Sequence, residues 1–209
     1  MNIPIPIPGS SGNQDDGPAA GPDDLSLSDV IGKESRINIF AGFTRMIPPT
    51  LCYLLGGTDN ATGDVDSIAK RLNDQGKQST VLAPLNSAIQ KLPRKPWEDP
   101  EDYNTIGAEA YKGEDGESRA SRNLRRFVEA HIVPVSPWKE GDKVQSLRGE
   151  TVWWESKDGK KIVRFAVANC NNCRANSLQI YPGNVEIDST VDKVDNGEVL
   201  SVKSCLNYA

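Results

Sequence analysis

Four cysteines and one histidine are the residues of this sequence that could bind a metal or carry redox or nucleophilic chemistry. Cys170 and Cys173 have the Cys-x-x-Cys spacing of redox motifs and of half a zinc site. A closed zinc site needs four ligands, and the remaining candidates are Cys52, Cys205 and His131. The sequence near the pair lacks the βαβ pattern of a thioredoxin-like motif. We therefore expect no metal site and no cofactor.

His131 is the one candidate for acid–base catalysis by an imidazole. Leu124, Phe127 and His131 follow helical spacing, which places the imidazole on an apolar helix face. This position predicts a buried histidine that hydrogen-bonds to the backbone. No pair of carboxylates is placed by the sequence in a recognisable cleft, so a glycosidase-like dyad has no support. We predict no catalytic residue, and an enzyme is disfavoured.

Charge and hydropathy argue against two kinds of partner. The chain has 24 Lys and Arg against 29 Asp and Glu, interspersed without a basic face, so nucleic acid is not expected. No run of 18 apolar residues occurs, so no transmembrane segment is predicted, and the first six residues do not form a signal peptide. Either the protein is cytosolic or a native signal peptide is absent from this sequence. The sequon at Asn60, a candidate glycosylation site, favours the second reading.

The elements that must position these residues change in character along the chain. Residues 1–24 are rich in Pro and Gly and are predicted to form a disordered tail. A short helix capped by Ser26 or Ser28 is expected within 24–31, and further helices over 37–46, 50–55, 65–72, 88–92 and 118–131. Residues 93–118 are predicted to form an irregular surface excursion with at most one helix. Strands are expected over 79–83, 143–147, 150–155, 160–165, 185–194 and 199–206, the first ended by Pro84. Helices followed by strands indicate an α+β fold, with an antiparallel sheet partly covered by helices.

Two further patterns concern the strand-rich half. Asp158-Gly159 and Asn196-Gly197 are turn signals, and we expect Asn196-Gly197 to be the stronger hairpin because both residues tolerate positive φ. Trp153 and Trp154 are neighbours on a strand, so their rings point to opposite faces. One ring should lie in the core, and the other is a candidate for surface contact.

Three segments in the right order resemble the characteristic regions of the fasciclin-like domain family. Residues 79–89 resemble its first signature region, a strand, an Ala-Pro corner and an Asn-x-Ala helix start. Residues 124–135 resemble the second, a helix that runs into His-x-x-Pro, and residues 195–206 resemble the closing hairpin. The resemblance implies structural roles for the matching residues: Thr80, Ala83, Pro84, Asn86, Ala88, Leu124, Phe127, His131, Pro134, Asn196 and Gly197.

The resemblance implies a wedge-shaped β-sandwich flanked by several helices, formed by a single domain over residues 25–209 and similar to small fungal members. It also implies a non-catalytic binding or adhesion module of the secretory pathway, secreted or vacuolar, with protein, membrane-proximal or cell-wall contacts and a protein partner still to be identified. A small-molecule or lipid carrier is the alternative, and it would need a deep apolar pocket. The family's Tyr-His motif, linked to integrin recognition in animal members, reads Ala130-His131 here, so that activity is not expected.

The 17 residues over 163–179 interrupt the resemblance. Removing them joins Ile162 to Ile180 in a smooth strand continuation. Codons for Val163 and Gln179 can carry the two ends of an intron. We expect a loop insertion or a retained intron at this place.

Overall fold

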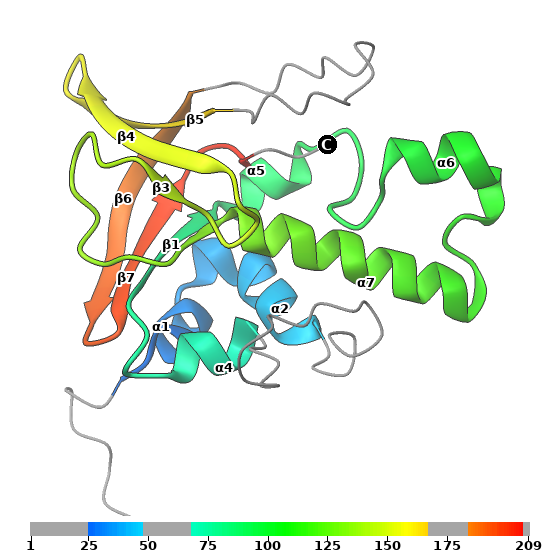
Figure 1. The fold of residues 1–209 in the computed structure, drawn as a ribbon, viewed down its shortest axis with the longest axis horizontal. Coiled ribbons are helices and arrows are strands. Elements are labelled where there is room, and N and C mark those ends of the chain that lie inside the picture. Colours follow the sequence, from blue (N-terminus) through cyan, green and yellow to red (C-terminus); the bar gives the residue numbers. More distant parts are fainter. Residues whose placement is uncertain (1–24, 48–67, 167–183, 207–209) are drawn as a thin grey trace, which may run out of the picture.

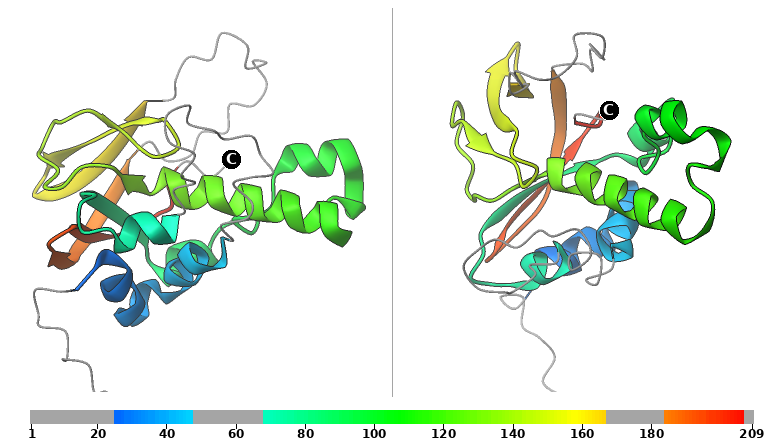
Figure 2. Two further views of the ribbon diagram at one scale, coloured as in Figure 1. Left: turned by 60° about the horizontal axis from the view of Figure 1, so that its bottom comes forward. Right: turned by 45° about the vertical axis from the view of Figure 1, so that its right-hand side comes forward.

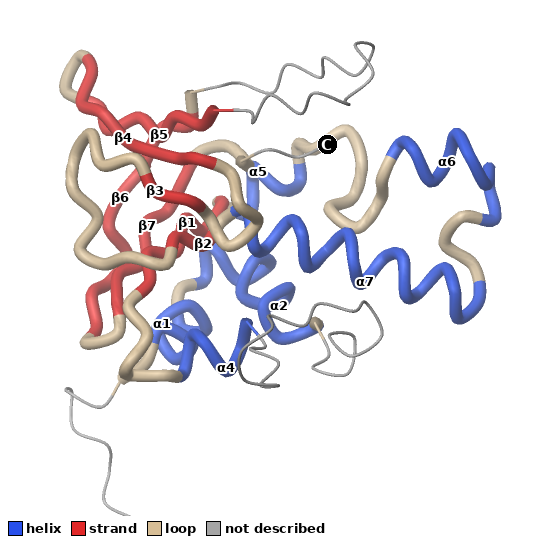
Figure 3. Tube along the Cα trace, viewed as in Figure 1, coloured by secondary structure: helices blue, strands red, loops and turns tan. Residues whose placement is uncertain are grey.

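The computed structural model describes residues 25–47, 68–166 and 184–206, and in them a seven-stranded sheet packs against helices (Figure 1). The helices are α1 (Leu27–Lys33), α2 (Asn38–Met46), α4 (Ile68–Asn73), α5 (Asn86–Gln90), α6 (Pro100–Ile106) and α7 (Gly113–Ala130), with two short 3₁₀ helices, η2 (Ser35–Ile37) and η3 (Gly107–Glu109). The strands are β1 (Ser79–Pro84), β2 (Ile132–Val133), β3 (Val144–Gln145), β4 (Thr151–Lys157), β5 (Lys160–Ala166), β6 (Val185–Val194) and β7 (Gly197–Val202). The α+β class is confirmed, and Figure 3 shows strands gathered on one side and helices on the other.

The strands follow the order β2-β1-β7-β6-β5-β4-β3. Neighbouring strands are antiparallel except β1 and β7, which run parallel from Ser79 opposite Gly197 to Pro84 opposite Val202. The expectation of an antiparallel sheet is therefore wrong at this pair. A parallel pair needs a long crossover, and here every other helix and strand after β1 lies between the two strands in sequence.

Two side-chain clusters lie on opposite faces of the sheet centre. Val81 and Ala83 of β1 pack with α1, α2, α4 and α7, whereas Leu82 between them belongs to the second cluster. Strand β6 pairs with β7 along its C-terminal part and with β5 at its start, so the sheet folds over on itself. The second cluster fills the space between the two halves, which diverge like a wedge in the right view of Figure 2.

Local rules explain where several helices begin. Ser26 is the N-cap of α1, and Asp29 accepts hydrogen bonds from its backbone N and its Oγ at 3.0 and 2.6 Å. Helix α7 begins at Gly113, five residues before the predicted start at 118, and carries Glu114 and Asp115 in its first turn, where carboxylates stabilise a helix N-terminus. The segment 93–118, predicted as an irregular excursion with at most one helix, contains the helix α6 and the short 3₁₀ helix η3 before α7 begins.

The two hairpin turns reverse the expected ranking. Asp158 and Gly159 both have positive φ, 53° and 75°, and form the two-residue loop between β4 and β5. Between β6 and β7 the loop is Asp195-Asn196, and Asp158 is the one non-glycine residue with positive φ among the described residues. The prediction that Asn196 adopts positive φ is therefore wrong, and its buried side chain explains why it is needed there.

The expected insertion over 163–179 starts inside a strand. Val163 is fully buried and pairs with Trp154 of β4 and Val185 of β6, so strand β5 runs past the residue at which the insertion is expected to begin. Strand β5 continues to Ala166 because these residues complete the ladder with β4. The remainder of that segment, the tail over 1–24 and the helix expected over 50–55 lie outside the described residues, as do Cys52, Asn60, Cys170 and Cys173.

Candidate binding surface

His131 lies at the C-terminal end of α7 and is completely buried. Its Nε2 accepts a hydrogen bond from the backbone N of Leu206 at 2.9 Å, so the proton sits on Nδ1, which donates to the carbonyl of Phe127 at 2.7 Å. Burial lowers the pKa of His131 to about 4, so the ring is neutral at pH 7. Both ring nitrogens hold the backbone together and neither is free for chemistry.

The residues around the β1 corner likewise make internal contacts. Thr80 Oγ1 donates to the carbonyl of Val135 at 2.7 Å. Asn86, the first residue of α5, accepts from the backbone N of Ile39 at 3.1 Å and donates to the carbonyl of Ser35 at 2.8 Å. Ala83, Ala88, Leu124 and Phe127 belong to the helical cluster, whereas Pro134 is exposed. Asn86 thus joins the strand-to-helix corner to η2 and to the first turn of α2.

Asn196 and Gly197 connect the β6–β7 hairpin to the helices. The buried amide of Asn196 accepts from the backbone N of Leu27 at 3.0 Å and donates to the carbonyl of Leu72 at 2.9 Å. Gly197 has φ 149°, and a Cβ built there would lie 1.8 Å from the carbonyl oxygen of Ser79. A side chain at 197 would therefore force β7 away from β1.

The adjacent tryptophans differ from the expectation of one core ring and one exposed ring. Both are half-buried. Trp154 packs at the margin of the second cluster and donates from Nε1 to the carbonyl of Trp138 at 3.1 Å. Trp153 belongs to neither cluster, and the Lys143 ammonium lies 5.3 Å from its ring centroid. The core tryptophan is Trp138, 5% exposed, which sequence reasoning missed because no periodic strand or helix surrounds it.

Trp153 stands on the outer face of β4 and β5, which we define as Trp153, Glu155, Ile162 and Arg164 with the adjoining Lys143 and Asn184. Trp153 is opposite Arg164 and Glu155 is opposite Ile162, while the intervening Val163 points into the second cluster. The helical cluster includes no residue from β3, β4 or β5 among the described residues. The helical cluster therefore does not extend to this face, whose β4 and β5 residues are half-buried.

Polar contacts order the side chains of the outer face. Arg164 donates from Nε to Glu155 Oε1 at 2.7 Å and from Nη1 to Asn184 Oδ1 at 2.6 Å. The Lys143 ammonium joins this group through its cation–π contact with the Trp153 ring. The result is an aromatic ring beside a fixed guanidinium, a combination suited to contact with another macromolecule.

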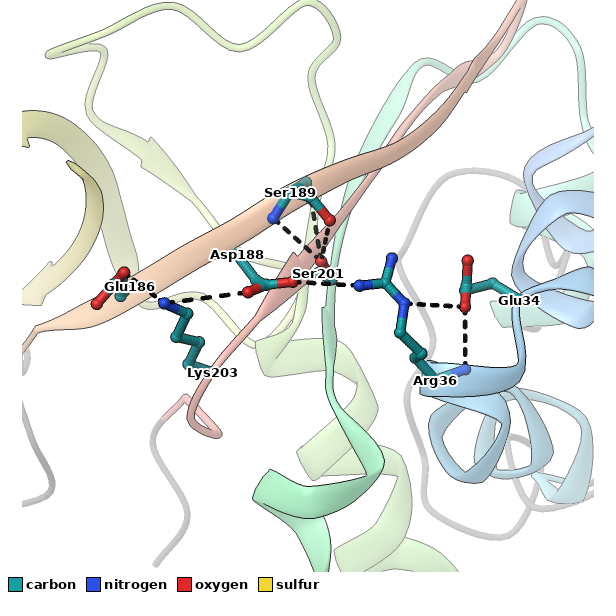
Figure 4. Close-up of polar contacts among 7 residues, drawn as sticks. All are labelled: Glu34, Arg36, Glu186, Asp188, Ser189, Ser201 and Lys203. Atoms are coloured by element: carbon teal, nitrogen blue, oxygen red, sulfur yellow. Dashed lines mark hydrogen bonds and ion pairs between the residues drawn. The ribbon is translucent and has the colours of Figure 1, made fainter. Parts of the chain in front are cut away.

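A chain of ion pairs extends this surface along β6 (Figure 4). Glu186 pairs with Lys203 at 2.6 Å and Lys160 at 3.3 Å, and Asp188 pairs with Arg36 at 3.4 Å. The hydrogen bond from Lys203, followed by that from Lys160, holds the pKa of Glu186 below its usual value. These exposed pairs add little stability individually, but they present alternating charges in defined positions.

An irregularity in β6 turns Asp188 toward the helices. The register shifts between Ile187 and Ser189, which leaves Asp188 without a directly opposite residue in β7. Ser201 fills the gap in the ladder, because its Oγ accepts from the backbone N of Ser189 at 3.2 Å and lies 2.9 Å from Ser189 Oγ. This bulge could not be predicted from the sequence, since its residues carry no turn signal.

The described residues contain no group of three or more His, Cys, Asp or Glu side chains arranged to hold a metal. Cys205 is a buried free thiol, and burial raises its pKa to about 12, so it is protonated and unreactive at pH 7. Within the described part of the chain, none of the helices combines the length and apolar character needed to cross a membrane.

No family model matches the chain. The curated proteins that it resembles are fungal and share one description. A FAS1 domain-containing protein of Neurospora crassa is 46% identical over 204 residues, covering 96% of this chain and 74% of the relative. One from Aspergillus fumigatus is 45% identical over 183 residues, covering 87% of this chain, which spans only 63% of that relative's length. A third, from Emericella nidulans, is 38% identical with 87% of this chain and 62% of the relative covered.

Among solved structures, the chain is similar to a FAS1 domain pair from the insect cell adhesion molecule fasciclin I. The TM-score is 0.50 with 10% sequence identity, and the match covers 87% of this chain and 50% of that one. At this identity the likeness concerns the fold.

Proposed function

Since this chain belongs to the FAS1 domain family, we propose that it is a non-catalytic binding module that acts in adhesion through its outer face. We further propose that residues 25–209 form its single domain and that the module works in the secretory pathway, at the fungal cell surface or in the vacuole. The solved relative is described as a cell adhesion molecule, which supports this class of function.

One observation carries the proposal: Trp153 and Ile162 lie outside both clusters, half-buried on a sheet face that also carries the ion pair of Arg164 with Glu155. Aromatic side chains and arginine are enriched at protein interfaces, and an arginine already held by Glu155 and Asn184 loses little freedom on binding. The outer face therefore has the composition of a contact surface rather than of ordinary solvated sheet.

The contacts of the family motif residues inside the fold also support a non-catalytic role. His131, Asn86 and Asn196 use their polar atoms on backbone partners, so their requirement is explained by the fold alone. The second cluster occupies the space between the sheet halves, which favours a binding module over a lipid carrier.

The test measures attachment of protein-coated beads to walled cells of a filamentous fungus. Trp153→Ala combined with Ile162→Ser should reduce attachment by roughly tenfold, as expected for loss of a central aromatic anchor. Met46→Ser is the matched control, because Met46 is 66% exposed on α2, away from the outer face. Thermal midpoints of all variants verify folding. Equal attachment by the parent and the folded double variant would show that the outer face is not the binding surface.

A second experiment addresses the compartment. The gene, expressed with its native start and a C-terminal fluorescent tag, should place the protein at the cell surface or in the vacuole. A diffuse cytosolic signal would contradict the secretory part of the proposal.

A further inference from the structure

Helix α6 lies at the end of the molecule away from the strands (Figure 1). None of its residues is buried. Tyr103 and Ile106 are 38% and 41% exposed, and at a spacing of three they lie on one face of the helix. With Met46 they are the exposed large hydrophobic residues of the described chain. A helix that shows its apolar side chains to solvent has an open surface for a partner.

The segment that carries this helix, residues 98–117, is strongly acidic; we name it the arm. The arm contains eight Asp and Glu residues against Lys112 as its one basic residue, a net charge of −7. The whole chain has a net charge of −5, so the rest of the chain is net positive by two. A partner that covers the arm must bring positive charge to it.

The arm is held in position by one network of hydrogen bonds and ring contacts on the side that faces α7. Tyr111 donates from its hydroxyl to Asp102 at 2.8 Å and accepts from the backbone N of Asp99. Asn123 of α7 donates to the same Asp102 carboxylate at 2.9 Å. Tyr103 packs edge-on against Tyr111, with ring centroids 5.3 Å apart. Burial raises the pKa of Tyr111 to about 12, so its hydroxyl keeps the proton that it donates.

Such a fixed arm has a physical consequence for binding. A partner need not order the helix when it docks, so little conformational entropy is lost. The fold maintains the network although α6 contributes nothing buried to the core. This is the arrangement expected of a preformed docking element.

The complementary surface is found on the same chain, at the opposite end. Of the side chains that define the outer face, Lys143 and Arg164 are basic and Glu155 is acidic. On the outer face, Lys143 borders Trp153, and Lys157 and Lys160 flank the β4–β5 turn. In Figure 1 the arm and the sheet half of β3, β4 and β5 lie at the two ends of the longest axis, so one molecule cannot join them itself.

We propose that the arm of one copy docks on the outer face of a second copy, head to tail, with Tyr103 and Ile106 against Trp153 and Ile162. This inference rests on the proposed function, since it names the partner of the same outer face. The two surfaces differ, so the contact is heterologous and each copy keeps one free arm and one free outer face. Repetition of the contact adds further copies, a geometry suited to multivalent attachment.

Sedimentation velocity of the purified chain tests the proposal. Association should be strong at about 20 mM NaCl and weaken by at least roughly tenfold at about 0.5 M, because exposed charges are screened. The arm variant Glu101→Lys/Ile106→Ser and the face variant Lys143→Glu/Trp153→Ser should each be monomeric. Met46→Ser should associate like the parent, because Met46 belongs to neither surface.

An equimolar mixture of the arm variant and the face variant separates head-to-tail docking from a symmetric contact. The arm variant keeps a native outer face and the face variant keeps a native arm, so the mixture should form a 1:1 complex. A mixture that stays monomeric, or a parent that is monomeric at low salt, would overturn the inference. If the parent is monomeric while bead attachment still depends on Trp153, the proposed function stands and only the self-association falls.

Discussion

The free energy of unfolding should decrease between pH 6.5 and pH 5 because of His131. In the unfolded chain its pKa has the ordinary value of 6.5, whereas burial lowers the folded-state pKa to about 4. Between these values the unfolded state binds a proton that the folded state does not, so the free energy of unfolding falls as the pH falls. The contribution of neutral His131 to stability is fully present above pH 6.5. Protonation of Nε2 would also remove the acceptor for the backbone N of Leu206.

The magnitude follows from the size of the shift. One pKa unit corresponds to about 1.4 kcal/mol, so roughly 2 kcal/mol is lost at pH 5 and about 3 kcal/mol below pH 4. His131 is the chain's one histidine, and the ordinary pKa values of Asp and Glu lie lower, near 4. The interval between pH 5 and 6.5 therefore reports on this single side chain.

Urea unfolding at a series of pH values measures the effect. The parent should show the slope, and His131→Gln should be flat over the same interval, because the amide retains a donor and an acceptor but does not titrate. At pH 7 this variant should be less stable by about 1–3 kcal/mol, since the amide cannot reach both backbone partners with the ring's geometry. A parent with the same stability at pH 5 and 7, or a variant that keeps the slope, would refute the reasoning.

Three further outcomes are expected. Phe127→Ala should lower the free energy of unfolding by about 3–5 kcal/mol in urea titrations, because the ring packs against Phe40, Phe43 and His131. The control Tyr103→Ala, at an exposed position, should lower it by less than about 1 kcal/mol. Similar losses in the two variants would disprove the assignment of the core. Asn196→Ala should lower the free energy of unfolding by about 1–3 kcal/mol for each backbone group left unpaired, at Leu27 and Leu72. Amide hydrogen exchange should also accelerate at the start of α1. Unchanged exchange there would count against this role of Asn196. Deleting residues 163–179 should leave a folded protein that is insensitive to chelator. In the shortened sequence Ile180 takes the place of Val163, and the residue types of Tyr181-Pro182-Gly183-Asn184 suit a type II turn. An unfolded product, seen by circular dichroism, would contradict the loop or intron hypothesis.

Elements with a strong local pattern could be predicted from the sequence. Strand β1 is a short apolar run that ends at proline, and the apolar face of α7 repeats over its last two turns. The burial of the whole β1 run and of the helically spaced residues of α7 follows from these local patterns. The start of α7 was missed because residues 113–117 are charged and glycine-rich, a composition that by itself indicates a loop.

Features that depend on distant partners could not be predicted. Asn196 reads locally as a turn residue, yet its amide bonds the backbone of Leu27, 169 positions away. The parallel pairing of β1 with β7 and the bulge at Asp188 likewise depend on how the sheet closes. The arm network joins Asp102, Tyr111 and Asn123, which lie on different elements and share no periodic pattern. The outer face was anticipated only in part, because the sequence pointed to the tryptophan pair but not to Arg164 or the charges along β6.

The central place of β7 has a consequence for biosynthesis. Strand β7 lies between β1 and β6, so the sheet stays split until residues 197–202 have left the ribosome. The pairing of β1 with β7 spans more than a hundred residues, and sheets closed by such distant contacts fold slowly, on the order of milliseconds to seconds. A nascent chain of this protein therefore emerges from the ribosome without its final sheet. A chain truncated before Gly197 lacks the strand that joins the two halves and cannot complete the domain.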